Sequence, residues 1–173
     1  MRHYLFALFI IFPVLSFGQQ WKSFTDTAGK FIAKYPSEWV NKIKENNRVF
    51  FTSPSDGDAD IFLENINISV TTKAGYGTSL KVKDLFPAIT DALKEQFNEF
   101  TEESQRFFKW NNADAAEITY TGYSKLDESI KVRAVQWYCF YRSRLYIATF
   151  VAEAANAKHN NTARKIMNGI LFK

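Results

Sequence analysis

Apolar and polar residues alternate along several short segments of this chain, as they do in β-strands that bury one face. The clearest case is 65–72, where Ile66, Ile68 and Val70 alternate with polar residues. Turn-forming residues such as those of 54–57 separate the segments. In the first half of the chain the pattern predicts strands over 24–26, 30–35, 48–52 and 65–72.

The second half of the chain has longer apolar runs, which predict strands over 104–110, 116–123, 131–141 and 145–152. The run 131–141 is apolar on both of its faces, so we expect it to be covered on both sides. One face holds Val132, Ala134, Tyr138 and Phe140, and the other holds Val135, Trp137, Cys139 and Tyr141.

Two segments have helical spacing instead. The first is predicted over 84–99, with Asp84 as N-cap and Pro87 in the first turn, where its missing N–H does little harm. The second is predicted over 156–168, with Asn156 as cap and Gly169 as stop. Hairpin-connected strands with two helices predict an α+β fold, an antiparallel β-sheet sandwiched by helices.

The first 18 residues have the composition of a secretory signal peptide. A short basic start precedes the apolar run Tyr4–Phe17, whose 14 residues fall short of the roughly 20 that a spanning helix needs. We expect cleavage after Gly18, although an uncleaved membrane anchor is the alternative. The predicted division is a signal peptide, 1–18, and one soluble domain, 19–173, that is exported and then periplasmic or secreted.

Charge and cysteine content exclude some classes of function. Removal of Arg2 with the signal leaves 21 basic and 18 acidic side chains, a net charge of +3, without the cluster of a nucleic-acid site. Cys139 is the only cysteine, so no intramolecular disulfide forms. The high aromatic content, with 17 Phe, is typical of a packed core.

The order of these features resembles the PsbP-like family, named after the extrinsic PsbP subunit of the photosynthetic oxygen-evolving complex. The resemblance implies an antiparallel sheet between helices, and it assigns no catalytic or metal-binding residue. This sequence departs from the family pattern at the turn 142–144. The matching pieces are 31–39 (FIAKYPSEW), 62–70 (FLENINISV), the single mid-chain helix, 117–122 (EITYTG), the aromatic hairpin and the closing helix.

Few residues offer catalytic chemistry. After cleavage His159 is the only histidine, and Cys139 lies within an aromatic strand where a cysteine is usually a buried apolar residue. Asp114 and Glu117 fit ordinary surface charges better than a catalytic pair. The sequence therefore predicts a protein that is not an enzyme.

A calcium site is the one metal site that the sequence suggests, and no other cofactor is expected. Carboxylates at two-residue spacing supply the oxygen ligands that calcium prefers, but Gly and Glu are missing where an EF-hand needs them. A solvated acidic turn is the alternative. The four candidate ligands are Asp56, Asp58, Asp60 and Glu64.

The leading hypothesis is an exported, non-enzymatic binding or accessory module of the cell envelope with a protein partner. Trp39 and Trp110, placed near strand or loop edges, are the predicted partner contacts because amphipathic aromatics are enriched in interfaces. The alternative is a carrier of a small apolar ligand or lipid. Its pocket would be lined by the aromatic residues Tyr138, Phe140, Tyr141, Tyr146 and Phe150.

Overall fold

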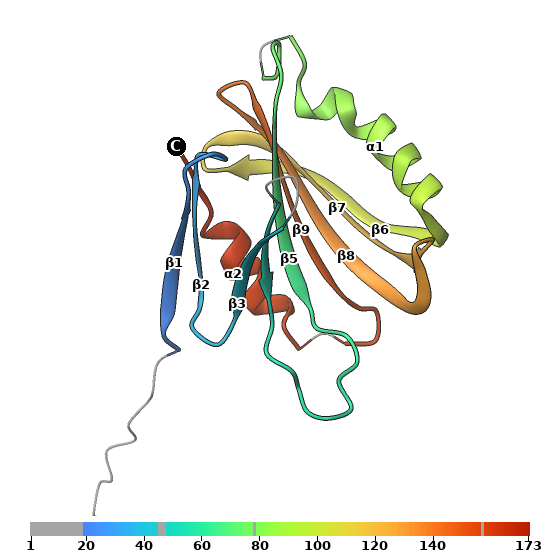
Figure 1. Ribbon diagram of the computed structural model, residues 1–173. Helices are drawn as coiled ribbons and strands as arrows, with labels where there is room; N and C mark the ends of the chain where they lie inside the picture. Colours follow the sequence, from blue (N-terminus) through green and yellow to red (C-terminus); the bar gives the residue numbers. More distant parts are fainter. Residues whose placement is uncertain (1–18, 45–47, 78, 157) are drawn as a thin grey trace, which may run out of the picture.

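The computed structural model describes residues 19–44, 48–77, 79–156 and 158–173. They form two antiparallel sheets and two helices arranged in layers (Figure 1). The elements are β1 (Trp21–Asp26), β2 (Phe31–Pro36), β3 (Val40–Lys44), β4 (Arg48–Thr52), β5 (Asn65–Thr72), α1 (Val82–Gln96), β6 (Phe97–Trp110), β7 (Ala113–Ser124), β8 (Asp127–Tyr141), β9 (Arg144–Glu153), α2 (Asn160–Asn168) and β10 (Leu171–Phe172).

The larger sheet has seven strands in the order β3-β4-β5-β9-β8-β7-β6 and separates two hydrophobic cores. The first core lies against the small sheet and α2, and the second lies under α1 (Figure 1). Val135, Trp137 and Cys139 of β8 belong to the first core, and Ala134 and Tyr138 belong to the second. The prediction that this strand is covered on both faces is confirmed, as is the α+β class.

The smaller sheet, in the order β1-β2-β10, joins the two ends of the described chain. Ala163, Ile166 and Met167 of α2 are fully buried, as predicted. The segment after α2 then pairs with β2 through Leu171 and Phe172. The Tyr146 hydroxyl of β9 donates to the carbonyl oxygen of Gly29 at 3.0 Å and so connects the two sheets.

Two-residue turns close the hairpins β6–β7 and β8–β9. Asn111 and Asn112 have φ of 50° and 64°, and Arg142 and Ser143 have φ of 48° and 59°. Positive φ at both positions matches the right-handed twist of the strands, which explains why a hairpin forms without an Asn-Gly pair. Arg144, expected in the turn, is the first residue of β9.

Both predicted helices have different bounds in the structure. α1 covers 82–96, and Asp84 lies inside it, where its carboxylate accepts the N–H of Lys81 at 3.1 Å. α2 begins at residue 160 because the Asn156 side chain accepts the N–H of Lys158 at 2.9 Å in a turn. The predicted N-caps were therefore wrong.

Several strands also differ from prediction: β1, β7 and β8 each begin three or four residues earlier than predicted. β6 begins at Phe97, seven residues before the predicted start, because pairing with Ser124 of β7 takes over directly from the helix. β3 was not anticipated, since only pairing with β4 fixes it. No described helix is long and apolar enough to cross a membrane. The predicted signal peptide, 1–18, lies outside the described residues.

Candidate functional site

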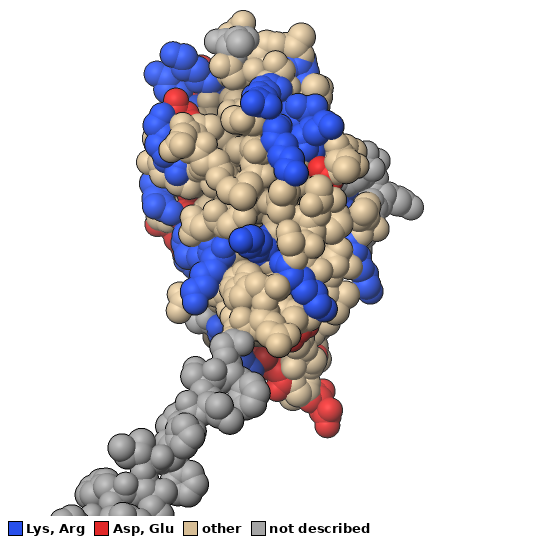
Figure 2. Space-filling model, turned by 90° about the vertical axis from the view of Figure 1, so that its left-hand side faces the viewer, with Lys and Arg blue, Asp and Glu red and all other residues tan. Residues whose placement is uncertain are grey.

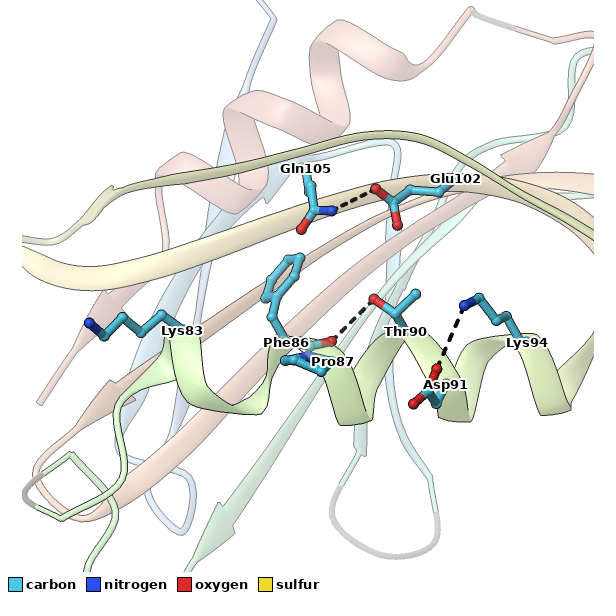
Figure 3. Close-up of a pocket in the computed structure, with 8 residues that line it drawn as sticks. All are labelled: Lys83, Phe86, Pro87, Thr90, Asp91, Lys94, Glu102 and Gln105. Atoms are coloured by element: carbon cyan, nitrogen blue, oxygen red, sulfur yellow. Dashed lines mark hydrogen bonds and ion pairs between the residues drawn. The ribbon is translucent and has the colours of Figure 1, made fainter.

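A groove lies between α1 and β6, on the face of the large sheet that α1 covers (Figure 3). Its volume is about 390 Å³. Because α1 leads directly into β6, the local chain path places helix and strand side chains on opposite walls. The lining residues are Lys83, Phe86, Pro87, Thr90, Asp91 and Lys94 of the helix and Glu102 and Gln105 of the strand.

Phe86 forms the apolar part of the helical wall. Its ring is 5.4 Å from that of Phe107 and 6.5 Å from that of Tyr138, so the second core holds it in place. Pro87 follows. Because α1 begins at Val82, Pro87 lies in the second turn and not in the first turn as predicted, and it has no N–H to donate to the preceding turn. One turn later the Thr90 hydroxyl donates to the carbonyl oxygen of Phe86 at 3.1 Å. This wall is therefore rigid and partly apolar.

The opposite wall is β6, a strand of 14 residues at the edge of the sheet, whose one partner among the described strands is β7. Gln105 donates to the carboxylate of Glu102 at 2.8 Å, and both side chains point toward the groove (Figure 3). Phe107, further along β6, is 59% exposed although it is a large apolar residue. An edge strand with an exposed aromatic is a surface suited to pairing with another chain.

A second hollow of about 310 Å³ continues the groove past Phe107 toward the start of α1. Lys83 lines both hollows, so the two are continuous along the N-terminal half of the helix. The remaining lining residues are Lys81, Val82, Asp114 and Ala115. The combined surface is elongated and mixes charged with apolar groups.

The charged groups of the groove include two carboxylates that interact with nearby lysines. Lys94 and Asp91 form an exposed ion pair at 3.6 Å, and a hydrogen bond and the charge of Lys109 lower the pKa of Asp114. No histidine or cysteine is among the residues that line the two hollows. The walls therefore supply charged, polar and apolar groups that a bound molecule could contact.

Trp39 and Trp110, the predicted partner contacts, lie in the first core and are each 2% exposed. The Trp39 ring packs edge-on against His159 at 5.7 Å, and the Trp110 indole N–H donates to the carbonyl oxygen of Met167 at 3.0 Å. Neither ring is accessible to a partner. An edge position predicts exposure, but His159, just before α2, packs on Trp39, and Met167 of α2 and Phe172 of β10 cover Trp110.

Three of the four carboxylates that suggested calcium have partners within the protein, and those of Asp56 and Glu64 both lie near His159. Glu64 is 1% exposed and accepts hydrogen bonds from Ser53 at 3.0 Å and from Asn156 at 2.8 Å. Asp56 pairs with Lys158 and lies 3.4 Å from His159 Nε2.

Asp60 instead accepts backbone N–H groups within its own loop, including that of Asp56 at 2.8 Å. Asp58 is exposed at the tip of the same loop. Within the described ranges no three His, Cys, Asp or Glu side chains are grouped as metal ligands. Calcium binding stays a prediction of the sequence alone.

The other candidate residues mostly serve packing. Cys139 is fully buried, and burial raises the pKa of its thiol to about 12, so it is not a nucleophile. The aromatic residues proposed to line a carrier pocket are split between the two cores: Tyr146 and Phe150 pack in the first, Tyr138 and Phe140 in the second. Tyr141 stacks on Phe172 with ring centroids 5.4 Å apart.

The sequence patterns do not single out Glu117, a buried carboxylate that residues from several elements contact. Glu117, expected at the surface, is 3% exposed. It accepts hydrogen bonds from Arg106 at 2.9 and 3.0 Å, from Arg164 at 3.0 Å and from the Trp137 indole at 2.5 Å. These partners are 11, 47 and 20 positions away, so no local pattern marks Glu117.

Comparison with known proteins adds evidence on the fold. No family model and no curated protein matches the sequence. Among solved structures, a protein of unknown function from Pseudomonas aeruginosa has a TM-score of 0.64 at 14% identity, over 88% of this chain and 97% of that one. The cyanobacterial PsbP of Synechocystis (CyanoP) has a TM-score of 0.61 at 10% identity, over 88% and 92%.

The Saccharomyces cerevisiae Ran-binding protein Mog1p has a TM-score of 0.59 at 7% identity, over 89% of this chain and 96% of that one. This chain has the PsbP and Mog1p fold. The similarity covers 88 to 89% of the chain in these three structures. At these identities the similarity establishes fold and nothing about activity.

Proposed function

We propose that this chain is an exported, non-enzymatic accessory protein of the PsbP-like type, which binds an extended segment of a partner protein along β6. The observation that carries the proposal is the free edge of β6 beside the α1–β6 groove, with Phe107 exposed in the adjoining hollow. The signal-peptide pattern of residues 1–18 motivates the export part of the proposal.

An extended segment fits this site for a geometric reason. A strand added to a sheet edge gains main-chain hydrogen bonds, and every second side chain points to the face that α1 covers. In this protein those side chains would enter the two hollows that flank Phe107. We expect the segment to carry an apolar residue for the Phe86–Phe107 pair and an acidic residue for Lys83.

Other features agree with a binding role. The fold neighbours include a protein described as Ran-binding, so this fold can serve protein recognition, although its partner says nothing of the partner here. The buried position of Cys139 and the core position of the aromatic residues support neither a thiol enzyme nor a carrier.

The test is a capture experiment with matched surface variants of the chain from Gln19. Phe107→Glu removes the aromatic anchor at the groove, whereas Leu126→Glu makes a similar apolar-to-acidic change at a residue that is 99% exposed on the β7–β8 turn. We expect a protein captured from an envelope extract to be lost with Phe107→Glu and retained with Leu126→Glu. An anchor of this kind is worth tenfold or more in affinity, on the order of a hot-spot residue.

The binding mode is then tested with peptides of the captured protein. Alternate backbone N–H groups of an added strand face β6, and methylation of those nitrogens removes their hydrogen bonds. We therefore expect binding to be lost when the nitrogens that face β6 are methylated and kept when the other set is methylated. Equal binding in both registers, or a capture that does not depend on Phe107, would contradict strand addition.

A further inference from the structure

Charge is divided unevenly between the two sides of the molecule. Residues 82–128, which contain α1, β6 and β7, have 5 basic and 10 acidic side chains, a net charge of −5. The rest of the chain from Gln19 has 16 basic and 8 acidic side chains, a net charge of +8. Figure 2 shows the side on which β1 lies, where Lys and Arg predominate and the main group of Asp and Glu lies at the lower end.

The outward face of the small sheet is the centre of this basic side. Along β2 the residues that point into the core alternate with Ile32 and Lys34, which point outward, and Lys30 is exposed in the turn just before the strand. Leu171 of β10 pairs with Ile32, and the N–H of Lys173 donates to the carbonyl oxygen of Lys30 at 2.8 Å. We call this surface the cationic face; it consists of Lys30, Lys34 and Lys173 with Trp21, Ile32 and Leu171.

None of the ion pairs among the described residues involves the three lysines of the cationic face. The acidic residue of the small sheet, Asp26, points to the other side and accepts the N–H of Gly29 at 2.8 Å. Arg142 lies near one end of the small sheet, because its guanidinium is 5.2 Å from the Tyr141 ring, which packs against Phe172 of β10. Lys73 adjoins it through a hydrogen bond to Ser143 at 3.4 Å.

The apolar residues between these cations are unusually exposed. Trp21 is 38% exposed and Leu171 is 47% exposed, whereas the other three tryptophans are at most 2% exposed. Lysines around an accessible tryptophan match the boundary of a bilayer, where ammonium groups reach the headgroups and an indole lies at their level. A soluble polyanion would satisfy the lysines but would leave Trp21 and Leu171 in water.

We propose that the cationic face binds the surface of a bilayer that contains anionic phospholipid. The domain would then lie on the membrane through the small sheet, with α1 and the groove on the opposite side of the large sheet. Peripheral binding of this kind depends on both charge and apolar contact, and added salt screens the charge contribution.

The experiment uses vesicles of phosphatidylcholine alone and of phosphatidylcholine with 30% phosphatidylglycerol. We expect the chain from Gln19 to sediment with the mixed vesicles in low salt, to be released by high salt, and to ignore neutral vesicles. Because Trp21 is the accessible tryptophan, brominated lipid should quench its emission, and Trp21→Phe should remove that quenching.

Charge reversal identifies the surface. Each lysine near an anionic membrane raises the affinity about fivefold. The double variant Lys34→Glu with Lys173→Glu should therefore lower the affinity for the mixed vesicles about 25-fold or more. The matched control is Lys125→Glu with Lys131→Glu, the same change of charge at residues that adjoin Gln96 and Glu99 near the end of α1. We expect the control to bind about as well as the unmodified chain does, with both variants melting cooperatively.

Three outcomes would overturn the proposal. They are failure to bind the mixed vesicles, equal weakening in both double variants, and binding without quenching of Trp21. Binding to heparin or to a second copy of the chain, without vesicle binding, would instead identify a general polyanion or self-association surface. The Phe107→Glu variant should bind vesicles normally, so failure of this proposal is distinguishable from failure of the groove proposal.

Discussion

Replacement of Glu117 by Gln tests whether a buried carboxylate holds three strands and a helix together. The side chain lies on β7 and is contacted by Arg106 of β6, Trp137 of β8 and Arg164 of α2. Gln keeps the shape and one acceptor oxygen but removes the charge that two guanidinium groups share. The variant therefore isolates the electrostatic contribution to the free energy of unfolding.

The magnitude follows from the pKa of Glu117. Burial alone would raise this pKa, but hydrogen bonds from Arg106 and Arg164 outweigh it and lower the value to about 2 from 4.5. This lowering of the Glu117 pKa on folding corresponds to about 3 kcal/mol in the free energy of unfolding at neutral pH. The side chains of Arg106 and Arg164 are 54% and 40% exposed, so solvent screens part of their attraction to Glu117. We therefore expect Glu117→Gln to lower the free energy of unfolding by about 2 kcal/mol.

The sign of the pH dependence is also fixed. Because the folded-state pKa is depressed, the contribution is complete above about pH 5 and is lost as the pH falls toward 2. The measurement is denaturant unfolding of the unmodified chain and of Glu117→Gln at pH 7 and pH 3. The difference between their free energies of unfolding at pH 3 should be less than half of that at pH 7. Asp114→Asn is the control, since Asp114 is 82% exposed, and it should change little.

A loss below about 0.5 kcal/mol at pH 7 would refute the reasoning, because a buried charge pair that loses one partner is expected to cost more. So would a difference that is the same at pH 7 and pH 3, since the lost stability would then arise from packing and not from the charge of Glu117.

Two further predictions concern the first core. Tyr146→Phe removes the hydrogen bond to Gly29 that joins β9 to the small sheet, and should lower the free energy of unfolding by about 1 kcal/mol in urea titrations; an unchanged midpoint would show that this bond contributes nothing. Cys139 should not react with a thiol reagent until the protein unfolds, because it is fully buried and its thiol pKa is raised to about 12; fast labelling at pH 8 without denaturant would contradict its position.

The sequence alone determined most of the architecture. Alternation along 65–72 gave the bounds of β5, and the two-sided apolar pattern of 131–141 predicted that β8 lies between two layers. Helical spacing placed both helices within a few residues, and it identified the buried face of α2. These features are readable because side-chain periodicity is a local property that the buried face imposes on the chain.

Only the tertiary structure decided where the candidate surfaces lie. Trp39 and Trp110 looked like edge residues, but α2 and β10, far away in the sequence, cover them. Glu117 looked like Asp114, but its partners come from three other elements. The groove exists because β6 is an edge strand beside α1, and edge position depends on strand order, which periodicity does not encode. The pattern of a segment specifies which face is buried, whereas the segments that cover that face are selected by the fold as a whole.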